Sequence, residues 1–165
     1  MKLEFDVKVT EKDLYSFNLE QAYKGSQGFI SLLFAVLLIA AAVLSGQKGN
    51  IEYVILYIIV GIVVLLYVPF SLKGRVKMVM KTNDVFAKPL HFTIDEKEIG
   101  VSQGEETAAL PWDQVYRFVA NDKRILIFSN RKNAYILPKE QLGESFDALK
   151  DIASKSLESY RLKIK

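Results

Sequence analysis

Two apolar runs joined by a short polar stretch constrain the fold of this chain more than any other feature of its sequence. Residues 29–44 and 54–72 carry no charged side chain, and SGQKGN lies between them at 45–50. As helices rising about 1.5 Å per residue, the runs with their flanking residues reach about 28 Å, close to the hydrocarbon thickness of a bilayer. The rest of a 165-residue chain is too small to cover two such helices on every face. We therefore expect a hairpin of two membrane-spanning helices.

Charged residues are distributed unevenly between the two ends of this hairpin. Lys48 and Glu52 roughly cancel at the turn, whereas Lys24 precedes the first span. A basic cluster follows the second span and consists of Lys73, Arg75, Lys77 and Lys81. Because cationic residues are enriched on the cytoplasmic side of membrane proteins, we expect a multi-pass protein of the cell membrane with N and C termini in the cytoplasm.

The basic cluster is the candidate membrane-surface site. Cationic side chains near a bilayer are attracted to anionic headgroups by about 1 kcal/mol each. Charges that only mark the end of a transmembrane helix produce the same pattern. The cluster therefore predicts contact with the lipid bilayer and leaves open whether it recognises particular headgroups.

Small residues within the spans indicate where helices can approach closely. Ala41 and Ser45 lie four residues apart in the first span, and Gly61 lies in the second. Such positions suit packing within the hairpin, which we favour, or the seam of a homodimer, which stays open. No ionisable residue lies in the middle of either span, which argues against a transporter or an ion path.

The segments outside the spans have the patterns of ordinary secondary structure. Apolar and charged residues alternate in KLEFDVKV (2–9), as in a half-buried strand. Thr10, followed three positions later by Asp13, predicts the start of a helix over about 11–24. The chain then divides into an N-terminal strand and helix (1–27), the transmembrane hairpin (28–72), a basic juxtamembrane helix (73–87) and a C-terminal domain (88–165).

The C-terminal domain alternates short apolar stretches with polar turns. Strands are predicted at 90–94, 99–103, 107–112, 114–120, 125–129 and 134–138. An amphipathic helix is predicted over about 141–160, with Phe146, Leu149, Ile152, Ala153, Leu157 and Tyr160 on one face. This order favours one antiparallel sheet, strongly bent or rolled and closed by the helix. The expected fold class is therefore a membrane α-helical hairpin plus an α+β cytoplasmic domain, whose sheet the strand at 2–9 can join.

The C-terminal domain contains the pair Trp112-Asp113 and the triplet Leu137-Pro138-Lys139. Together with the hairpin and the basic helix that precede them, these motifs resemble the YcxB-like family of bacterial membrane proteins. The resemblance implies a cytoplasmic-membrane protein of the Gram-positive type, whose C-terminal domain is a pleckstrin-homology-like β-roll capped by a helix. It implies no activity and no ligand residues.

No catalytic or metal-binding constellation is recognisable in the sequence. Cysteine is absent, and the single histidine, His91, has no motif partner. Acidic residues gather in two turns, where solvated carboxylates are common. Basic runs with interleaved aromatic residues, typical of nucleic-acid grooves, are also missing. We expect no enzyme activity, no metal, no cofactor and no nucleic-acid partner.

One set of residues is a candidate site for a protein partner. The set consists of Trp112, Asp113, Arg117, Arg124 and Arg131. Tryptophan and arginine are enriched at energetically important interface positions. A tryptophan at the end of a strand also commonly fills the end of a small β-domain, and that alternative is the favoured one.

The function expected from these features is a membrane-anchored, non-enzymatic binding or regulatory module at the cytoplasmic face of the inner membrane. Its partners would be the lipid bilayer and a protein, either a neighbouring membrane protein or a toxin. The alternative is an immunity protein that protects against a membrane-active toxin or bacteriocin. The basis of this alternative is the small size, the paired spans and the nearly featureless turn between them.

Overall fold

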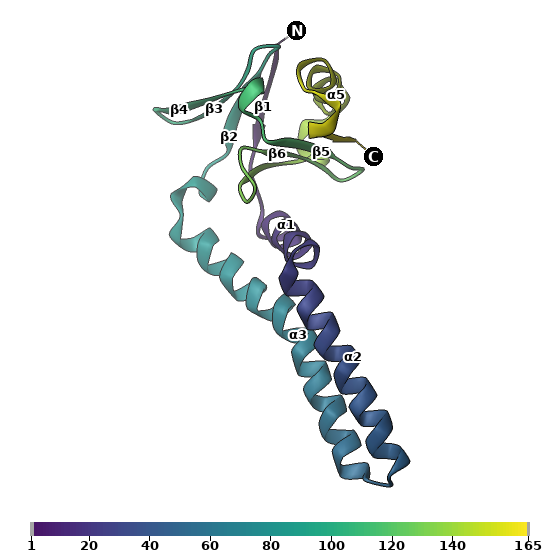
Figure 1. The fold of residues 1–165 in the computed structure, drawn as a ribbon. Coiled ribbons are helices and arrows are strands. Elements are labelled where there is room, and N and C mark those ends of the chain that lie inside the picture. Colours follow the sequence, from purple (N-terminus) through teal and green to yellow (C-terminus); the bar gives the residue numbers. More distant parts are fainter. Residues whose placement is uncertain (1, 165) are drawn as a thin grey trace. The chain divides into compact units, whose positions relative to one another are not determined.

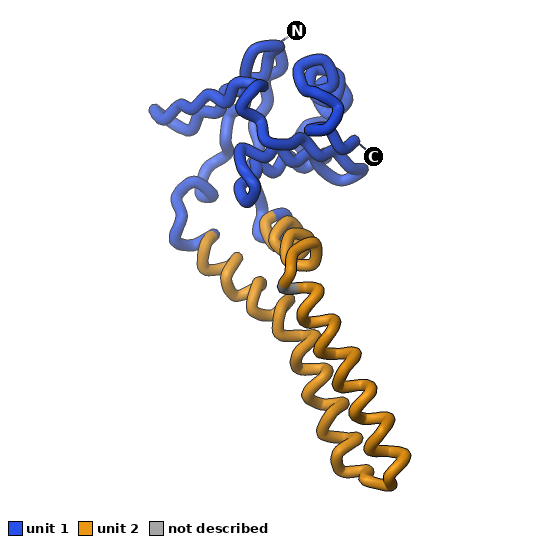
Figure 2. The backbone as a smooth tube through the Cα atoms, in the orientation of Figure 1, with its two compact units in different colours: residues 1–13, 80–165 blue, residues 14–79 orange. Residues whose placement is uncertain are grey.

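The computed structural model describes residues 2–164, with the exception of the Gln27 side chain, and the chain forms two compact units. Unit 1 combines the two ends of the chain, residues 1–13 and 80–165, and unit 2 consists of residues 14–79 (Figure 2). The chain therefore starts in unit 1, passes through unit 2 and returns to unit 1.

Unit 2 is helical. It is built from most of α1 (Glu11–Lys24), all of α2 (Ser26–Gln47) and most of α3 (Ile51–Thr82). Thr10 caps α1, because its Oγ1 accepts a hydrogen bond from Asp13 N at 3.2 Å while Asp13 Oδ2 accepts one from Thr10 N at 3.0 Å. This reciprocal pair confirms the helix start that the sequence predicts. Helix α3 continues through Pro69 and includes the whole basic cluster.

The antiparallel helices α2 and α3 form a hairpin with a tight turn (Figure 1). Gly49 takes a positive φ of 78° in this turn, and Asn50 N donates to Ser45 O at 3.0 Å. Gly46 faces Val54, and Gly61 faces Leu38. In each facing pair the two residue numbers add to about 100. The apolar stretch 29–44 of α2 therefore lies beside the apolar stretch 54–72 of α3 along its whole length.

The first sheet of unit 1 is fully antiparallel. Its order is β1-β2-β3-β4, with β1 at Leu3–Val7, β2 at Leu90–Ile94, β3 at Glu98–Gln103 and β4 at Glu106–Pro111. Strand β1 pairs with β2 from Leu3↔Ile94 to Val7↔Leu90. The first strand of the chain and the strand that follows the helical hairpin are therefore neighbours in one sheet.

The second sheet of unit 1 has the order β7-β6-β5-β8. Its strands are β5 (Arg117–Ala120), β6 (Arg124–Phe128), β7 (Ala134–Pro138) and β8 (Leu162–Ile164). The pairs β5–β6 and β6–β7 are antiparallel, whereas β8 pairs parallel with β5. The single bent sheet expected from the sequence is thus replaced by two four-stranded sheets, and β8 is a strand that the sequence analysis did not predict.

Short helices complete unit 1. These are η1 (Asp84–Phe86), η2 (Trp112–Gln114), α4 (Lys139–Leu142), α5 (Ser145–Ser156) and η3 (Ser159–Arg161). Helix α5 packs Phe146, Leu149 and Ile152 into a core that also contains buried residues of both sheets. The prediction of one helix over 141–160 is wrong at its end, because the chain becomes extended at Leu157 and leaves Tyr160 72% exposed.

The coarse architecture agrees with the expectation from the sequence. Two long apolar helices are combined with an α+β unit built on antiparallel sheets. Within residues 2–164, two segments are long and apolar enough to cross a membrane, Gly28–Gln47 in α2 and Ile51–Thr82 in α3.

Candidate functional site

Trp112 lies in the core of unit 1 and not on its surface. Its side chain is only 3% exposed, and its Nε1 donates a hydrogen bond to Asp95 O at 2.8 Å. Its backbone N also donates to Lys97 O at 3.3 Å. The indole therefore closes the end of the first sheet, and this side chain presents no platform to a partner.

The turn that receives the indole is held by the side chain of Asp95. Asp95 Oδ1 accepts hydrogen bonds from Lys97 N at 2.7 Å and from Glu98 N at 3.0 Å. These two backbone donors stabilise the carboxylate and lower the pKa of Asp95 below its usual value. Asp95 thus stabilises the β2–β3 turn through its carboxylate and holds the Trp112 indole through its backbone carbonyl.

Two of the candidate arginines are largely withdrawn from solvent. Arg124 on β6 is 8% exposed. Arg117 on β5 is half-buried, and its guanidinium carbon lies 4.8 Å from the centre of the Phe128 ring, a cation–π arrangement. Both side chains are therefore part of the packing around the second sheet, and neither is at the centre of an exposed basic patch.

A shallow groove of about 400 Å³ lies on the surface of unit 1. We call it the Tyr160 groove. It is formed by the segment before β5, the turn between β6 and β7, and η3, and its lining residues are Asp113, Gln114, Val115, Tyr116, Ser129, Asn130, Arg131, Tyr160 and Arg161. Asp113 and Arg131 are the two candidate residues that the structure brings together here.

Arg161 connects two sides of the Tyr160 groove, η3 and the segment before β5. Its Nη1 donates to Asp113 O at 2.7 Å and to Val115 O at 3.1 Å, and its Nε donates to the Tyr160 hydroxyl at 3.0 Å. The bond to Tyr160 raises the pKa of Arg161 above its usual value. As in any arginine, the guanidinium is positively charged at physiological pH. Tyr160 and Tyr116 leave aromatic surface exposed beside it, at 72% and 44%.

Residues 94–153 match a family model described as YcxB-like protein. This segment is YcxB-like. The match confirms the resemblance that the order of segments suggests. No curated protein and no solved structure matches the chain.

The YcxB-like segment covers much of unit 1 and part of the Tyr160 groove. It extends from the last residue of β2 into α5, and it contains Asp113, Tyr116 and Arg131 of the groove. Tyr160 and Arg161 lie beyond it. Sequence reasoning also missed these two: it placed Tyr160 at the end of a helix that stops four residues earlier, and it gave Arg161 no role.

The basic cluster lies outside the YcxB-like segment, on the last turns of α3. All four side chains are exposed. Lys73, Lys77 and Lys81 are four residues apart and therefore share one face of the helix, whereas Arg75 points to a different face. The stripe from Lys73 to Lys81 extends about 12 Å along the helix axis.

His91 forms a pair with one carboxylate. Its Nδ1 lies 2.8 Å from Asp6 Oδ1, and the two residues face each other across β1 and β2. Between residues 2 and 164, no group of three or more histidine, aspartate or glutamate residues is arranged to hold a metal ion. The pair connects the N-terminal strand to the first strand after the helical hairpin.

Proposed function

We propose that this chain is a membrane-anchored, non-enzymatic binding module. The α2–α3 hairpin crosses the cell membrane, and unit 1 forms a pleckstrin-homology-like domain on the cytoplasmic side. There it binds a segment of a protein partner in the Tyr160 groove.

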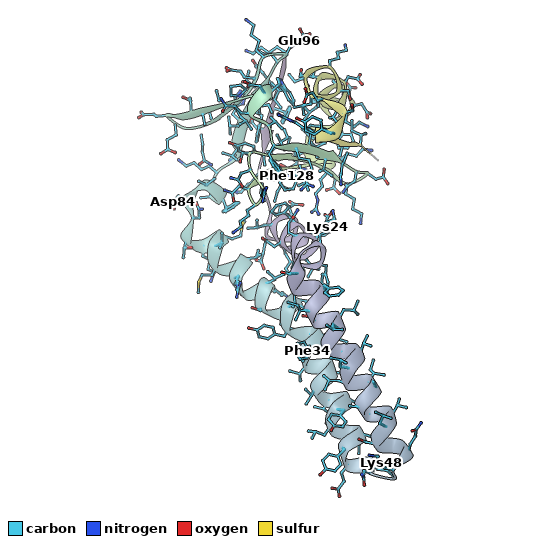
Figure 3. The ribbon with its side chains drawn as sticks, viewed as in Figure 1. Lys24, Phe34, Lys48, Asp84, Glu96 and Phe128 are labelled. Carbon is cyan, nitrogen blue, oxygen red and sulfur yellow. The ribbon has the colours of Figure 1, made fainter. Side chains whose placement is uncertain are left out.

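The observation that carries the membrane anchor is the exposure of apolar side chains around the whole hairpin. Only 17% of the most apolar window of α2 and 11% of that of α3 are buried within the protein. Figure 3 shows side chains projecting outward along both helices, with Lys48 at the turn. Large apolar surfaces of this kind are covered by lipid in a membrane protein. The matching levels of the two apolar stretches support one common bilayer around both helices.

The sheet pairing of unit 1 supports placing both termini on one side. Because β1 pairs with β2, the segments before and after the hairpin belong to one folded unit. A chain that crosses the membrane twice returns to the side where it began, and the two flanks carry Lys24 and the basic cluster. The excess of positive charge favours the cytoplasmic side.

The arrangement of unit 1 is compatible with a pleckstrin-homology-like roll. Two mainly antiparallel sheets share one core, and the C-terminal helix α5 packs into it. The resemblance to the YcxB-like family implies the same ingredients. That resemblance and this arrangement together are the basis for the finer fold assignment.

The chemistry of the Tyr160 groove favours a protein partner. Exposed tyrosine and arginine side chains are enriched at protein interfaces, where they supply apolar area together with directed hydrogen bonds. The groove is shallow, as suits a side chain of a partner that lies across the surface. Arg131 and Arg161 favour an acidic segment in that position.

Site-specific photo-crosslinking tests this proposal in living cells. A photoreactive phenylalanine analogue at Tyr160 should give a discrete adduct with a protein partner. Arg131→Glu should weaken this adduct strongly, whereas the matched control Lys155→Glu on the exposed face of α5 should leave it unchanged. The absence of an adduct, or equal adducts in both charge-reversal variants, would contradict a role for the groove.

A further inference from the structure

The two sheets of unit 1 have four edge strands, β1, β4, β7 and β8. Helices α4 and α5 lie against β1, and the Gln141 side chain is bonded to the backbone N and O of Lys8 just beyond β1, at 2.8 and 3.0 Å. Strand β7 leads directly into α4 and is buried over its last three residues. Strand β8 has only three residues.

Strand β4 differs from these three edges. It has six residues, its first four are exposed, and it forms the outer edge of its sheet (Figure 1). No charged side chain occurs from Thr107 to Leu110. Natural edge strands are usually protected from pairing by charges, prolines, bulges or a covering element. Glu106, the first residue of β4, is charged, and after it the only one of these protective features within the strand is Pro111 at its end.

The pairing of β3 with β4 determines which backbone groups point outward. The Gly104-Glu105 turn closes the pair Gln103↔Glu106, and Trp112 N bonds to Lys97 O. Alternate residues of an antiparallel strand direct their N–H and C=O to opposite sides. Glu106, Ala108 and Leu110 therefore direct these groups toward β3, whereas Thr107 and Ala109 direct theirs away from the sheet.

We propose that β4 pairs antiparallel with β4 of a second copy of this chain, with Ala108 on the two-fold axis. Thr107 then faces Ala109 of the second copy, and the two symmetric pairs form four N–H···O bonds. Ala108 faces its own counterpart at the close spacing of a non-hydrogen-bonded pair, where a methyl side chain fits. Glu106 faces Leu110, so like charges are kept apart.

Neighbouring registers are less favourable. A shift that centres the axis on Ala109 sets the Thr107 carbonyl against the nitrogen of Pro111, which has no hydrogen to donate. A shift that centres it on Thr107 pairs Ala109 with Glu105 of the turn and brings Glu105 and Glu106 of both copies close together. Ala108 is therefore the favoured centre.

The chain contains no cysteine, so a single introduced thiol tests the pairing directly. Ala108→Cys in the full-length chain, purified in mild detergent, should form a disulfide-linked dimer under mild oxidation. Residues in a close cross-strand pair bring their Cβ atoms near the separation that a disulfide needs. Ala109→Cys, one residue away and also exposed, should cross-link several-fold more slowly, and Lys155→Cys on α5 gives the rate of random collision.

Two results would overturn this inference. One is cross-linking of Ala108→Cys at the rate of Lys155→Cys, and the other is faster cross-linking of Ala109→Cys than of Ala108→Cys. Adding Thr107→Pro to Ala108→Cys removes one bonding N–H per copy and should lower its rate toward the collision rate. The fluorescence of Trp112 shows whether this variant keeps its fold, because that indole is buried in the core.

Discussion

At the scale of single residues, Trp112 and Asp95 connect two turns of unit 1. Trp112 is nearly fully buried, and its indole N–H bonds to the Asp95 carbonyl. The Asp95 carboxylate in turn receives two backbone N–H groups. Loss of either side chain should therefore destabilise the junction between the first and the second sheet.

Trp112→Ala should lower the free energy of unfolding of unit 1 by about 3–5 kcal/mol, because it leaves a cavity of aromatic size. Trp112→Phe keeps most of the apolar volume but leaves the Asp95 carbonyl without its donor, at a cost of about 1–3 kcal/mol. Urea unfolding followed by circular dichroism measures both values. As a control, Asp113→Ala at the exposed neighbouring position should change the free energy of unfolding by less than about 0.5 kcal/mol. A larger effect of Asp113→Ala would contradict the assignment of this stabilising role to Trp112.

The turn bonds of Asp95 predict a dependence of stability on pH. The pKa of Asp95 is lower in the folded protein than its ordinary value of 3.8. The ionised carboxylate therefore stabilises the fold above pH 3.8, and this stabilisation is lost as the pH falls through the folded pKa. Asp95→Asn removes the titrating group, so its unfolding midpoint should fall less than that of the parent between about pH 5 and 2.5. Asp151→Asn, at an exposed position of α5, is the control. Parallel curves for Asp95→Asn and the parent would rule out this role.

The candidate site could be predicted only in part from single residues. Asp113 and Arg131 follow from sequence reasoning because both lie in polar turns, and turns remain on the surface. Trp112 and Arg124 are both buried. The core position of Trp112 is the alternative that the sequence favours, whereas no sequence pattern distinguishes Arg124 from an exposed arginine. Tyr160 and Arg161 depend on where α5 ends, which is a property of an element and not of a residue.

At the scale of elements, the strands of unit 1 are predicted well and the end of the chain is not. Apolar stretches separated by polar turns locate β1 to β4, β6 and β7 within one or two residues, because short strands between such turns leave a local pattern in the sequence. In 141–160 the apolar spacing continues formally to Tyr160, but the helix ends at Ser156. Strand β8 depends on pairing with β5, about forty residues away in the chain, which three residues cannot encode locally.

Gly143 separates α4 from α5 and explains why the predicted single helix is broken. Its φ of 53° and ψ of −126° lie in a region that essentially only glycine adopts. Gly143→Ala should therefore destabilise unit 1 by about 1–3 kcal/mol. In Gly74→Ala, by contrast, the added methyl meets open space within α3, and stability should stay equal or rise slightly. Thermal unfolding distinguishes the two, and a neutral Gly143→Ala would show that the break between the helices is not required.

At the scale of the whole molecule, the helical hairpin is an insertion between two neighbouring strands of one sheet. β1 precedes the hairpin, β2 follows it, and the two pair along their length. Two apolar helices of matching extent therefore leave and re-enter a single folded unit. This arrangement can cross a bilayer without dividing unit 1 between two compartments.

The most direct test of this account is the labelling of single cysteines on intact cells with a membrane-impermeant maleimide. Lys48→Cys, in the turn between α2 and α3, should be labelled on intact cells. Lys155→Cys, exposed on α5 of unit 1, should be labelled only after the cells are permeabilised. Labelling of Lys155→Cys on intact cells, or recovery of the chain in the soluble fraction, would contradict the account.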